Sequence, residues 1–153
     1  MTMKVAIASD HAGFVEKEAI KNQLQEMGIN FEDLGTDSAH VSVDYPIYGA
    51  KVAEAVASGS ADKGIVVCGS GIGISIAANK VPGIRAAVAW NRESAELARH
   101  HNDANVLAVG GRTSSSGTIR DIVDACLTSD FDGGRHARRI QEIADLEKKY
   151  SGA

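Results

Sequence analysis

Cysteine is scarce in this sequence, and its scarcity excludes two common ways of stabilising a small protein. The 153 residues include only Cys68 and Cys126, which lie far apart and form no Cys-x-x-Cys pair. A disulfide framework and a structural zinc site both need more cysteines at closer spacing. We therefore expect reduced thiols, a cytoplasmic location and a fold that needs no metal or disulfide.

Long apolar runs and an excess of positive charge are also missing. No segment approaches the ~20 apolar residues that span a bilayer, and residues 1–9 lack the zones of a signal peptide. The net charge is −4, so nucleic acid meets no general positive field. We expect neither a membrane nor a nucleic-acid partner. With only two prolines and no repeat or linker, residues 1–153 are predicted to form a single domain.

Short β-rich runs alternate with helical patterns along the chain. Strands are predicted at 4–9, 30–34, 63–68, 84–89 and 105–109. Helices are predicted at about 14–27, 47–57, after Gly73 to about 80, and at about 92–101, 115–128 and 135–150. The alternation predicts an α/β fold of the Rossmann-like, doubly wound type, with helices on both faces of a five-stranded parallel sheet. We expect the strand order 2-1-3-4-5.

Ligands of such folds bind beyond the carboxyl ends of the strands, where the strand order reverses. In the expected order this point lies between the first and third strands. It brings Asp10 and His11 beside the segment 68–73, and the ends of the fourth and fifth strands add Trp90-Asn91 and Gly110–Arg112 to the same rim.

Cys68 ends the third predicted strand, just before a glycine-rich turn and a helix. The N-terminus of a helix stabilises an anion, so this position suits a thiolate that acts as base or nucleophile. The alternative is a buried structural cysteine, which is the usual role of a free cysteine. The strand-end position favours the functional interpretation. Cys126, in contrast, falls on an apolar helical stripe and is predicted to lie in the core.

The segment after Cys68 is rich in glycine. Its residues are Gly69, Ser70, Gly71, Ile72 and Gly73. Several backbone N–H groups here can bind one anion, either a phosphate or an enediolate oxygen. The alternative is a tight strand-to-helix turn. A dinucleotide site is poorly supported, because its fingerprint opens the first strand–helix unit and requires an acidic residue at the end of the next strand.

Other polar residues have two interpretations each. Asp10 caps a turn, contacts a ligand, or does both. His100 and His101 either complement the dipole of the helix that they end or move protons. Adjacent histidines on a helix point about 100° apart, which disfavours a shared metal. The arginines at 135, 138 and 139 open the last helix, where cations oppose the dipole. Either an anion offsets them (Asp130 and Asp132, a partner chain or a phosphate), or they form a solvated surface cluster.

Several of these motifs together resemble a known family. They are Asp10-His11-Ala12-Gly13, Asp44-Tyr45-Pro46, Cys68-Gly69-Ser70-Gly71-Ile72-Gly73, Ala77-Ala78-Asn79-Lys80, His101-Asn102-Asp103 with Asn105-Val106-Leu107, and Gly134-Arg135-His136. In order and spacing they are similar to the family of ribose-5-phosphate isomerase B and galactose-6-phosphate isomerase, over nearly the whole chain.

The resemblance implies an aldose–ketose isomerase that acts on a phosphosugar without metal or cofactor. It implies the interconversion of ribose 5-phosphate and ribulose 5-phosphate through a cis-enediolate. It also implies a homodimer, in some members a tetramer, whose sites are built from two chains. We expect the helix at about 135–150 to reach the partner chain.

The resemblance also assigns roles to residues. Cys68 matches the base, and His101 matches the residue that assists ring opening. The residues implied to contact the sugar or its phosphate are Asp10, His11, Gly69, Ser70, Gly71, Ile72, Gly73, Asn102, Arg112, Arg135 and Arg139. Tyr45 is a further candidate that either lines the site or only packs. Ser70 stands where many members have threonine, and Ile74 occupies the region where one branch uses a carboxylate instead of the cysteine.

Four alternatives remain at this point. In the first, the substrate is a six-carbon phosphosugar, such as allose 6-phosphate or galactose 6-phosphate, instead of ribose 5-phosphate. In the other three, the chain is a phosphosugar-binding module without turnover, a dinucleotide-dependent oxidoreductase or a thiol redox protein. The last is weakened by the lack of a second cysteine near Cys68.

Overall fold

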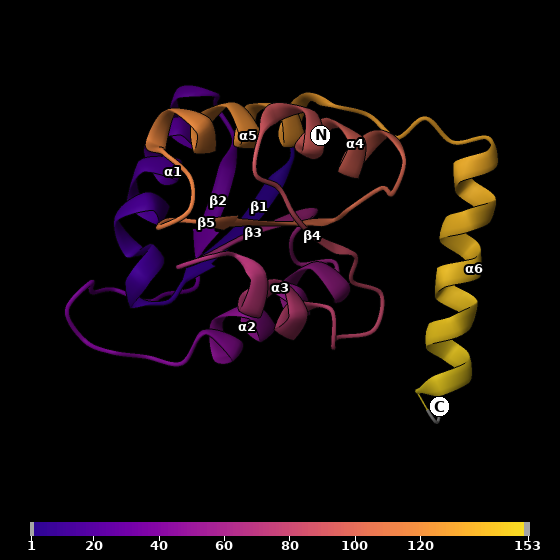
Figure 1. The fold of residues 1–153 in the computed structure, drawn as a ribbon, viewed down its shortest axis with the longest axis horizontal. Helices are drawn as coiled ribbons and strands as arrows, with labels where there is room; N and C mark the ends of the chain where they lie inside the picture. The colour runs from indigo at the N-terminus through magenta and orange to yellow at the C-terminus, as the bar shows by residue number, and fades with distance from the viewer. Residues whose placement is uncertain (1, 152–153) are drawn as a thin grey trace.

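Strands and helices alternate in the computed structural model, which describes residues 2–151 (Figure 1). The strands are β1 (Lys4–Ser9), β2 (Asn30–Asp33), β3 (Lys63–Cys68), β4 (Ala86–Val88) and β5 (Val106–Gly110). The helices are α1 (Phe14–Glu26), which follows a short 3-10 turn (His11–Gly13), α2 (Tyr45–Ala57), α3 (Ile72–Ala78), α4 (Arg92–His100), α5 (Ser116–Thr128) and α6 (Arg135–Tyr150). Every expected element is present, and several ends differ from expectation by one or two residues.

The five strands form one parallel sheet in the order β2-β1-β3-β5-β4. The α/β class with helices on both faces is therefore confirmed, but the expected order 2-1-3-4-5 is wrong for the last two strands. β5 is buried over its whole length and takes the inner position. β4 has only three residues, all half-buried, and lies at the edge. Inner strands of parallel sheets are covered on both faces and are continuously apolar, which fits β5 better than β4.

Two apolar clusters cover the two faces of the sheet. On one face, residues of α1, α4 and α5 pack on alternate residues of the strands, such as Ile65 and Val67. On the other face, α2 and α3 pack on Val66 and Cys68 (Figure 1). Cys126 lies in the first cluster, as expected for a core residue. Burial of a valine or isoleucine is worth about 1.5–3 kcal/mol, so these clusters hold the ends of β1 and β3 rigidly in place.

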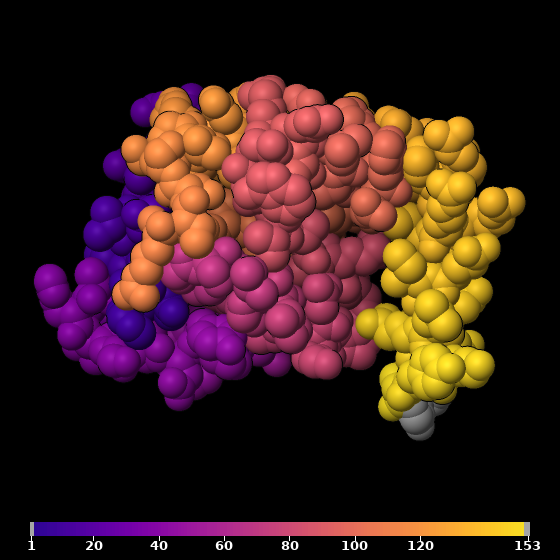
Figure 2. Space-filling view, viewed as in Figure 1, coloured from indigo at the N-terminus to yellow at the C-terminus, as the bar shows by residue number. Residues whose placement is uncertain are grey.

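The last helix, α6, belongs to neither layer. It stands beside the body, and its C-terminal end projects beyond it (Figures 1 and 2). A backbone N–H of Gly83 donates to Glu147 Oε2 at 3.0 Å, which ties α6 to the loop before β4. Ile143, Leu146 and Tyr150 are 47%, 54% and 75% exposed. The apolar side of α6 is therefore only partly covered by its own chain. Within the described residues, no helix has the length and apolar character needed to cross a bilayer.

Candidate functional site

An open cavity of roughly 640 Å³ lies at the carboxyl ends of β1 and β3. Its volume is in the range of small-molecule sites. The cavity is lined by Asp10, His11, Ala12, Tyr45, Cys68, Gly69, Ser70, Ile72, Gly73, Arg112 and Thr113. The expected meeting of the first and third strands is thus confirmed. The expected contribution of Trp90 and Asn91 is wrong, because β4 lies at the edge of the sheet and β5 separates it from β3.

The sulfur of Cys68 faces a backbone donor. Cys68 ends β3 and is 5% exposed, and its Sγ accepts a hydrogen bond from the N–H of Gly71 at 3.2 Å. Gly71 has φ +78°, and a Cβ there would lie 2.9 Å from the carbonyl carbon of Val109. Only glycine fits this conformation and this space. The loop is therefore shaped to direct an N–H group at the sulfur, and such a donor stabilises a thiolate.

The rest of the loop is held by close packing. The Oγ of Ser70 accepts from the N–H of Ile72 at 3.2 Å. The ring of Tyr45, at the start of α2, lies against Gly73, where a Cβ would be 2.5 Å from Tyr45 Cε1. Tyr45 therefore both lines the cavity and packs on the loop, so its two interpretations hold together. The hydrogen bond to Ser70 and the packing of Tyr45 on Gly73 therefore fix the backbone of the loop.

The pair after β1 contributes a cap and an oriented imidazole. Asp10 is buried, and its Oδ1 accepts from the N–H of Gly13 at 3.1 Å, which confirms the capping role. The Nδ1 of His11 accepts from the N–H of Val43 at 3.1 Å. With Nδ1 engaged as an acceptor, the neutral ring carries its proton on Nε2. His11 thus offers the cavity a donor of fixed direction.

Arg112 supplies positive charge at the cavity rim. Its backbone N–H donates to the carbonyl of Gly69 at 2.9 Å, and its side chain lies along Gly69. The N–H of Gly111 donates to the carbonyl of Cys68 at the same distance. The segment after β5 is therefore tied to the glycine-rich loop. Among the residues that line this cavity, Arg112 is the only arginine or lysine.

Five expected site residues do not line this cavity. One is Gly71, whose N–H is directed at Cys68 Sγ from within the loop. The other four lie elsewhere. His101, Asn102, Arg135 and Arg139 lie where α4 ends and α6 begins. His101 is the C-cap of α4, and both arginines are exposed on α6. The carbonyl of Asn102 accepts from Arg85 Nε at 3.1 Å. One chain therefore presents two separate groups of expected residues, the Cys68 cavity and this second group.

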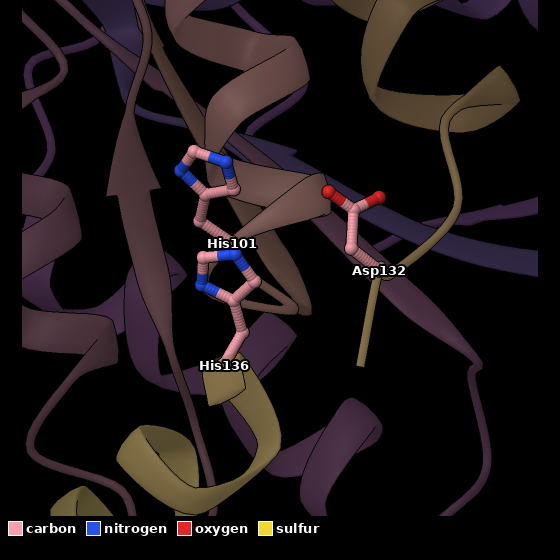
Figure 3. A group of neighbouring side chains, drawn as sticks. All are labelled: His101, Asp132 and His136. Atoms are coloured by element: carbon pink, nitrogen blue, oxygen red, sulfur yellow. The ribbon is translucent and has the colours of Figure 1, made fainter. Parts of the chain in front are cut away.

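The second group contains a stacked pair of imidazoles. The rings of His101 and His136 lie with centroids 4.3 Å apart and planes 10° from parallel (Figure 3). Nitrogen or oxygen atoms of both rings and of Asp132 lie within 4.8 Å of one another. Lone pairs of imidazole nitrogens lie in the ring plane, so two nearly parallel rings do not direct them at one point. Arg135 and Arg139 place positive charge beside His136. Geometry and charge both disfavour a metal centre here.

A smaller groove of roughly 270 Å³ lies between α1 and α5. It is mainly apolar and is lined by Val15, Ile20 and Ile119, with Glu16 and Arg120 among its polar residues. No cysteine or histidine lines it. We therefore place the chemistry in the Cys68 cavity.

Comparison with known proteins decides the family. A family model described as Ribose/Galactose Isomerase matches residues 5–143. The chain belongs to this family. Ribose-5-phosphate isomerase B of Escherichia coli is 47% identical over 146 residues, which cover 95% of this chain and 97% of that protein.

Solved structures of ribose-5-phosphate isomerase B have the same fold as this family member. The structure from Clostridium thermocellum has a TM-score of 0.95 at 54% identity and covers 97% of this chain and 99% of that one. A structure from Mycoplasma genitalium holds bound ribulose 5-phosphate, and it has a TM-score of 0.93 at 41% identity. It covers 97% of this chain and 99% of that chain.

Some features of this ribose/galactose isomerase family member were missed in the sequence. His136 belongs to the motif Gly134-Arg135-His136, but only the fold shows that it stacks on His101. Val43 was not singled out, because its backbone N–H, not its side chain, orients His11. Thr113 follows the predicted rim residue Arg112 and lines the cavity with it. The sequence signal that could have identified Thr113 is its position shortly after an inner strand of the sheet.

Proposed function

We propose that this chain is an aldose–ketose isomerase that interconverts ribose 5-phosphate and ribulose 5-phosphate, with no metal or cofactor. The observation that carries the proposal is the Cys68 sulfur at the cavity, with the N–H of Gly71 directed at it. A thiolate held in this way is a base of the kind that removes a proton next to a carbonyl. The relationship to proteins named ribose-5-phosphate isomerase B supports the choice of substrate.

The proposed reaction uses the two groups of residues in turn. His101 assists opening of the furanose, which exposes the C1 aldehyde. The Cys68 thiolate then takes the proton from C2, and the electron pair forms the C1–C2 double bond while charge moves to O1. Backbone N–H groups of the loop 69–73 stabilise this cis-enediolate. The proton of the O2 hydroxyl passes to O1, and Cys68 returns its proton to C1 as the C2 carbonyl forms, which gives the ketose.

We infer that the complete site is made by two chains of a homodimer. The Cys68 cavity of one chain has no lining residue from the group of His101, Asn102, Arg135 and Arg139. The partly uncovered apolar side of α6 offers a surface through which a second copy places that group over the cavity. The two arginines then bind the phosphate together with Arg112, and the phosphate orients the reacting carbons. A tetramer, the single-domain organisation of 1–153 and a cytoplasmic location stay predictions.

A six-carbon phosphosugar is the second candidate substrate. The family description names galactose beside ribose. The openness of the cavity in one chain leaves room for one more CH–OH unit. Comparison of kcat/KM for ribose 5-phosphate and for the six-carbon phosphosugars decides which is the preferred substrate.

The test is a turnover assay on the purified chain treated with EDTA. Ribose 5-phosphate, allose 6-phosphate and galactose 6-phosphate are supplied in parallel, and ketose formation is followed. We expect turnover of ribose 5-phosphate that survives EDTA and falls by about 10²–10⁴-fold in Cys68→Ala. Cys126→Ala is the matched control and should keep its rate. Binding of all three sugars without turnover would refute the isomerase and favour the binding module.

A further inference from the structure

His136 is the residue in the second group to which neither the motifs nor the proposed steps give a role. It lies in the first turn of α6, and its side chain is 9% exposed although its helix neighbours on both sides are exposed. Its ring is stacked on that of His101, with centroids 4.3 Å apart and planes 10° from parallel, and Figure 3 shows the two rings side by side. The ring contact that the structure shows for this buried imidazole is the stack on His101.

The His101 ring needs such a contact. Its backbone N–H continues the ladder of α4 by donating to the carbonyl of Leu97 at 2.9 Å. Within residues 2–151, no side-chain hydrogen bond fixes the His101 imidazole. Its neighbour His100 is held differently, by the carbonyl of Asp130 at 2.8 Å and by Asp132 Oδ1 at 3.1 Å. The stack on His136 is therefore the ring contact that the structure shows for His101.

The charge state of His136 suits this contact. Burial lowers the pKa of His136 below the usual value for histidine. Repulsion from His101, Arg135 and Arg139 lowers it further, and Asp132 acts in the opposite direction. These groups come from α4, from α6 and from the loop between α5 and α6. The ring is therefore neutral at pH 7, and its neutral face can lie against His101 whether or not His101 carries a proton.

We propose that His136 is a positioning residue for His101: its ring face sets the direction in which His101 meets the sugar. This role rests on the proposed function, in which His101 assists ring opening. It acts through His101 and needs no contact between His136 and the substrate. Misplacing a reacting group by about 1 Å can cost about a hundredfold in rate, so loss of the stack should reduce kcat.

The test compares His136→Ala and His136→Phe on ribose 5-phosphate, with KM and kcat measured separately. We expect kcat to fall between about tenfold and a hundredfold in His136→Ala, with KM within about twofold of wild type. His136→Phe keeps an aromatic face and should recover most of kcat. Gln141→Ala, at an exposed position whose side chain donates a hydrogen bond to Asp145 of the same helix, reports any general effect of disturbing α6. Thermal unfolding of each variant shows whether it is folded.

A third variant separates positioning from other roles. In a His101→Ala background, His136→Ala should cause almost no further loss, because the residue that it positions is gone. A full additional loss there, or a rise in KM with kcat unchanged, would overturn the positioning role. If His136→Ala does not fold, His136→Phe decides alone, and a folded Phe variant with the rate of His101→Ala would also overturn it. A wild-type chain without turnover would instead refute the proposed function itself.

Discussion

The two cysteines of this chain have the same residue type and similar burial but different surroundings. Burial raises the pKa of the Cys126 thiol, and nearby Lys63 and Arg99 offset this only in part. Cys68 lines the open cavity and receives the N–H of Gly71. We expect iodoacetamide to alkylate Cys68 at least about tenfold faster than Cys126 in the folded protein at pH 7, as measured by peptide mass spectrometry. Equal rates would show that the Gly71 contact does not activate the sulfur.

A carboxylate paired with a buried lysine makes the stability of the chain depend on pH. The ammonium of Lys17 is fully buried, and its Nζ lies 2.7 Å from Asp33 Oδ1. Burial acts to raise the pKa of Asp33, but hydrogen bonds from Lys17 and Lys21 outweigh it, so the pKa of Asp33 is lowered. Asp33 therefore contributes stability above its ordinary pKa, and this contribution is lost as the pH falls through the lowered value in the folded state.

Asp33→Asn tests this contribution. The variant leaves the buried Lys17 charge without its carboxylate, so the free energy of unfolding at pH 7 should fall by about 1–3 kcal/mol. Denaturation in urea at pH 7, 5 and 3 should show the difference from wild type narrowing as the pH falls. Glu32→Gln, in the neighbouring exposed pair with Lys4, is the control and should change stability by less than about 1 kcal/mol. A difference that is constant with pH would contradict the assignment to Asp33.

At the scale of elements, hydrophobic pattern was sufficient to place the strands and helices. β1, β3 and α6 begin and end where the sequence predicts. The order of β4 and β5 could not be obtained in this way, because both follow a helix and both are apolar. Their order depends on how well each fills an inner position, and the longer, fully buried β5 fills it better. Which strands lie next to each other in the sheet depends on packing between elements. The local hydrophobic pattern does not determine it.

The same distinction applies to the site. The Cys68 loop was predictable because its residues are consecutive and follow an inner strand. The meeting of Asp10 with Cys68 was predictable because parallel strands end at the same edge. The stack of His101 on His136 was not predictable, because α4 and α6 are joined through β5, α5 and a loop whose path the sequence does not specify. That group also stays away from the cavity of its own chain, which no residue pattern indicated.

Helix α6 carries three arginines in its first turns, and they should differ in function. Arg138 Nε lies 3.9 Å from Glu142 Oε1 on the same helix, and both side chains are largely exposed. Arg135 and Arg139 are four residues apart and share a face. Loss of a charge-assisted hydrogen bond to phosphate costs about 1.5–3 kcal/mol. We therefore expect Arg135→Ala and Arg139→Ala to raise the KM for ribose 5-phosphate by about ten- to a hundredfold.

Arg138→Ala is the matched control for these two variants, because it removes the same charge from the same helix. Its KM should stay within about twofold of wild type, since the exposed Glu142 pair contributes little. Steady-state kinetics at fixed ionic strength separate a specific contact from a general loss of positive charge. An equal rise of KM in all three variants would show a general effect of lost positive charge. It would contradict a specific contact of Arg135 and Arg139 with the phosphate.

At the scale of the whole molecule, one chain holds the proposed base and the proposed ring-opening residue in separate places. Cys68 lies in the cavity at the ends of β1 and β3, and His101 lies at the C-terminal end of α4, stacked on His136 of α6. If two chains exchange these groups, each site takes its cavity from one chain and its His101 from the other. Inactive variants of different chains can then restore each other.

Co-expression of Cys68→Ala and His101→Ala chains with different tags tests this exchange. Random pairing makes about half of the dimers mixed, and each mixed dimer has one site without either substitution, so about a quarter of the wild-type activity should return. His11→Ala paired with Cys68→Ala is the control: both residues line the cavity of one chain, so a mixed dimer has no intact site and recovers nothing. Recovery in neither pair would mean that each chain brings its own His101 to its own cavity. In that case, the separation of the two groups in one chain would have to close by a movement of α4 and α6 rather than by dimerisation.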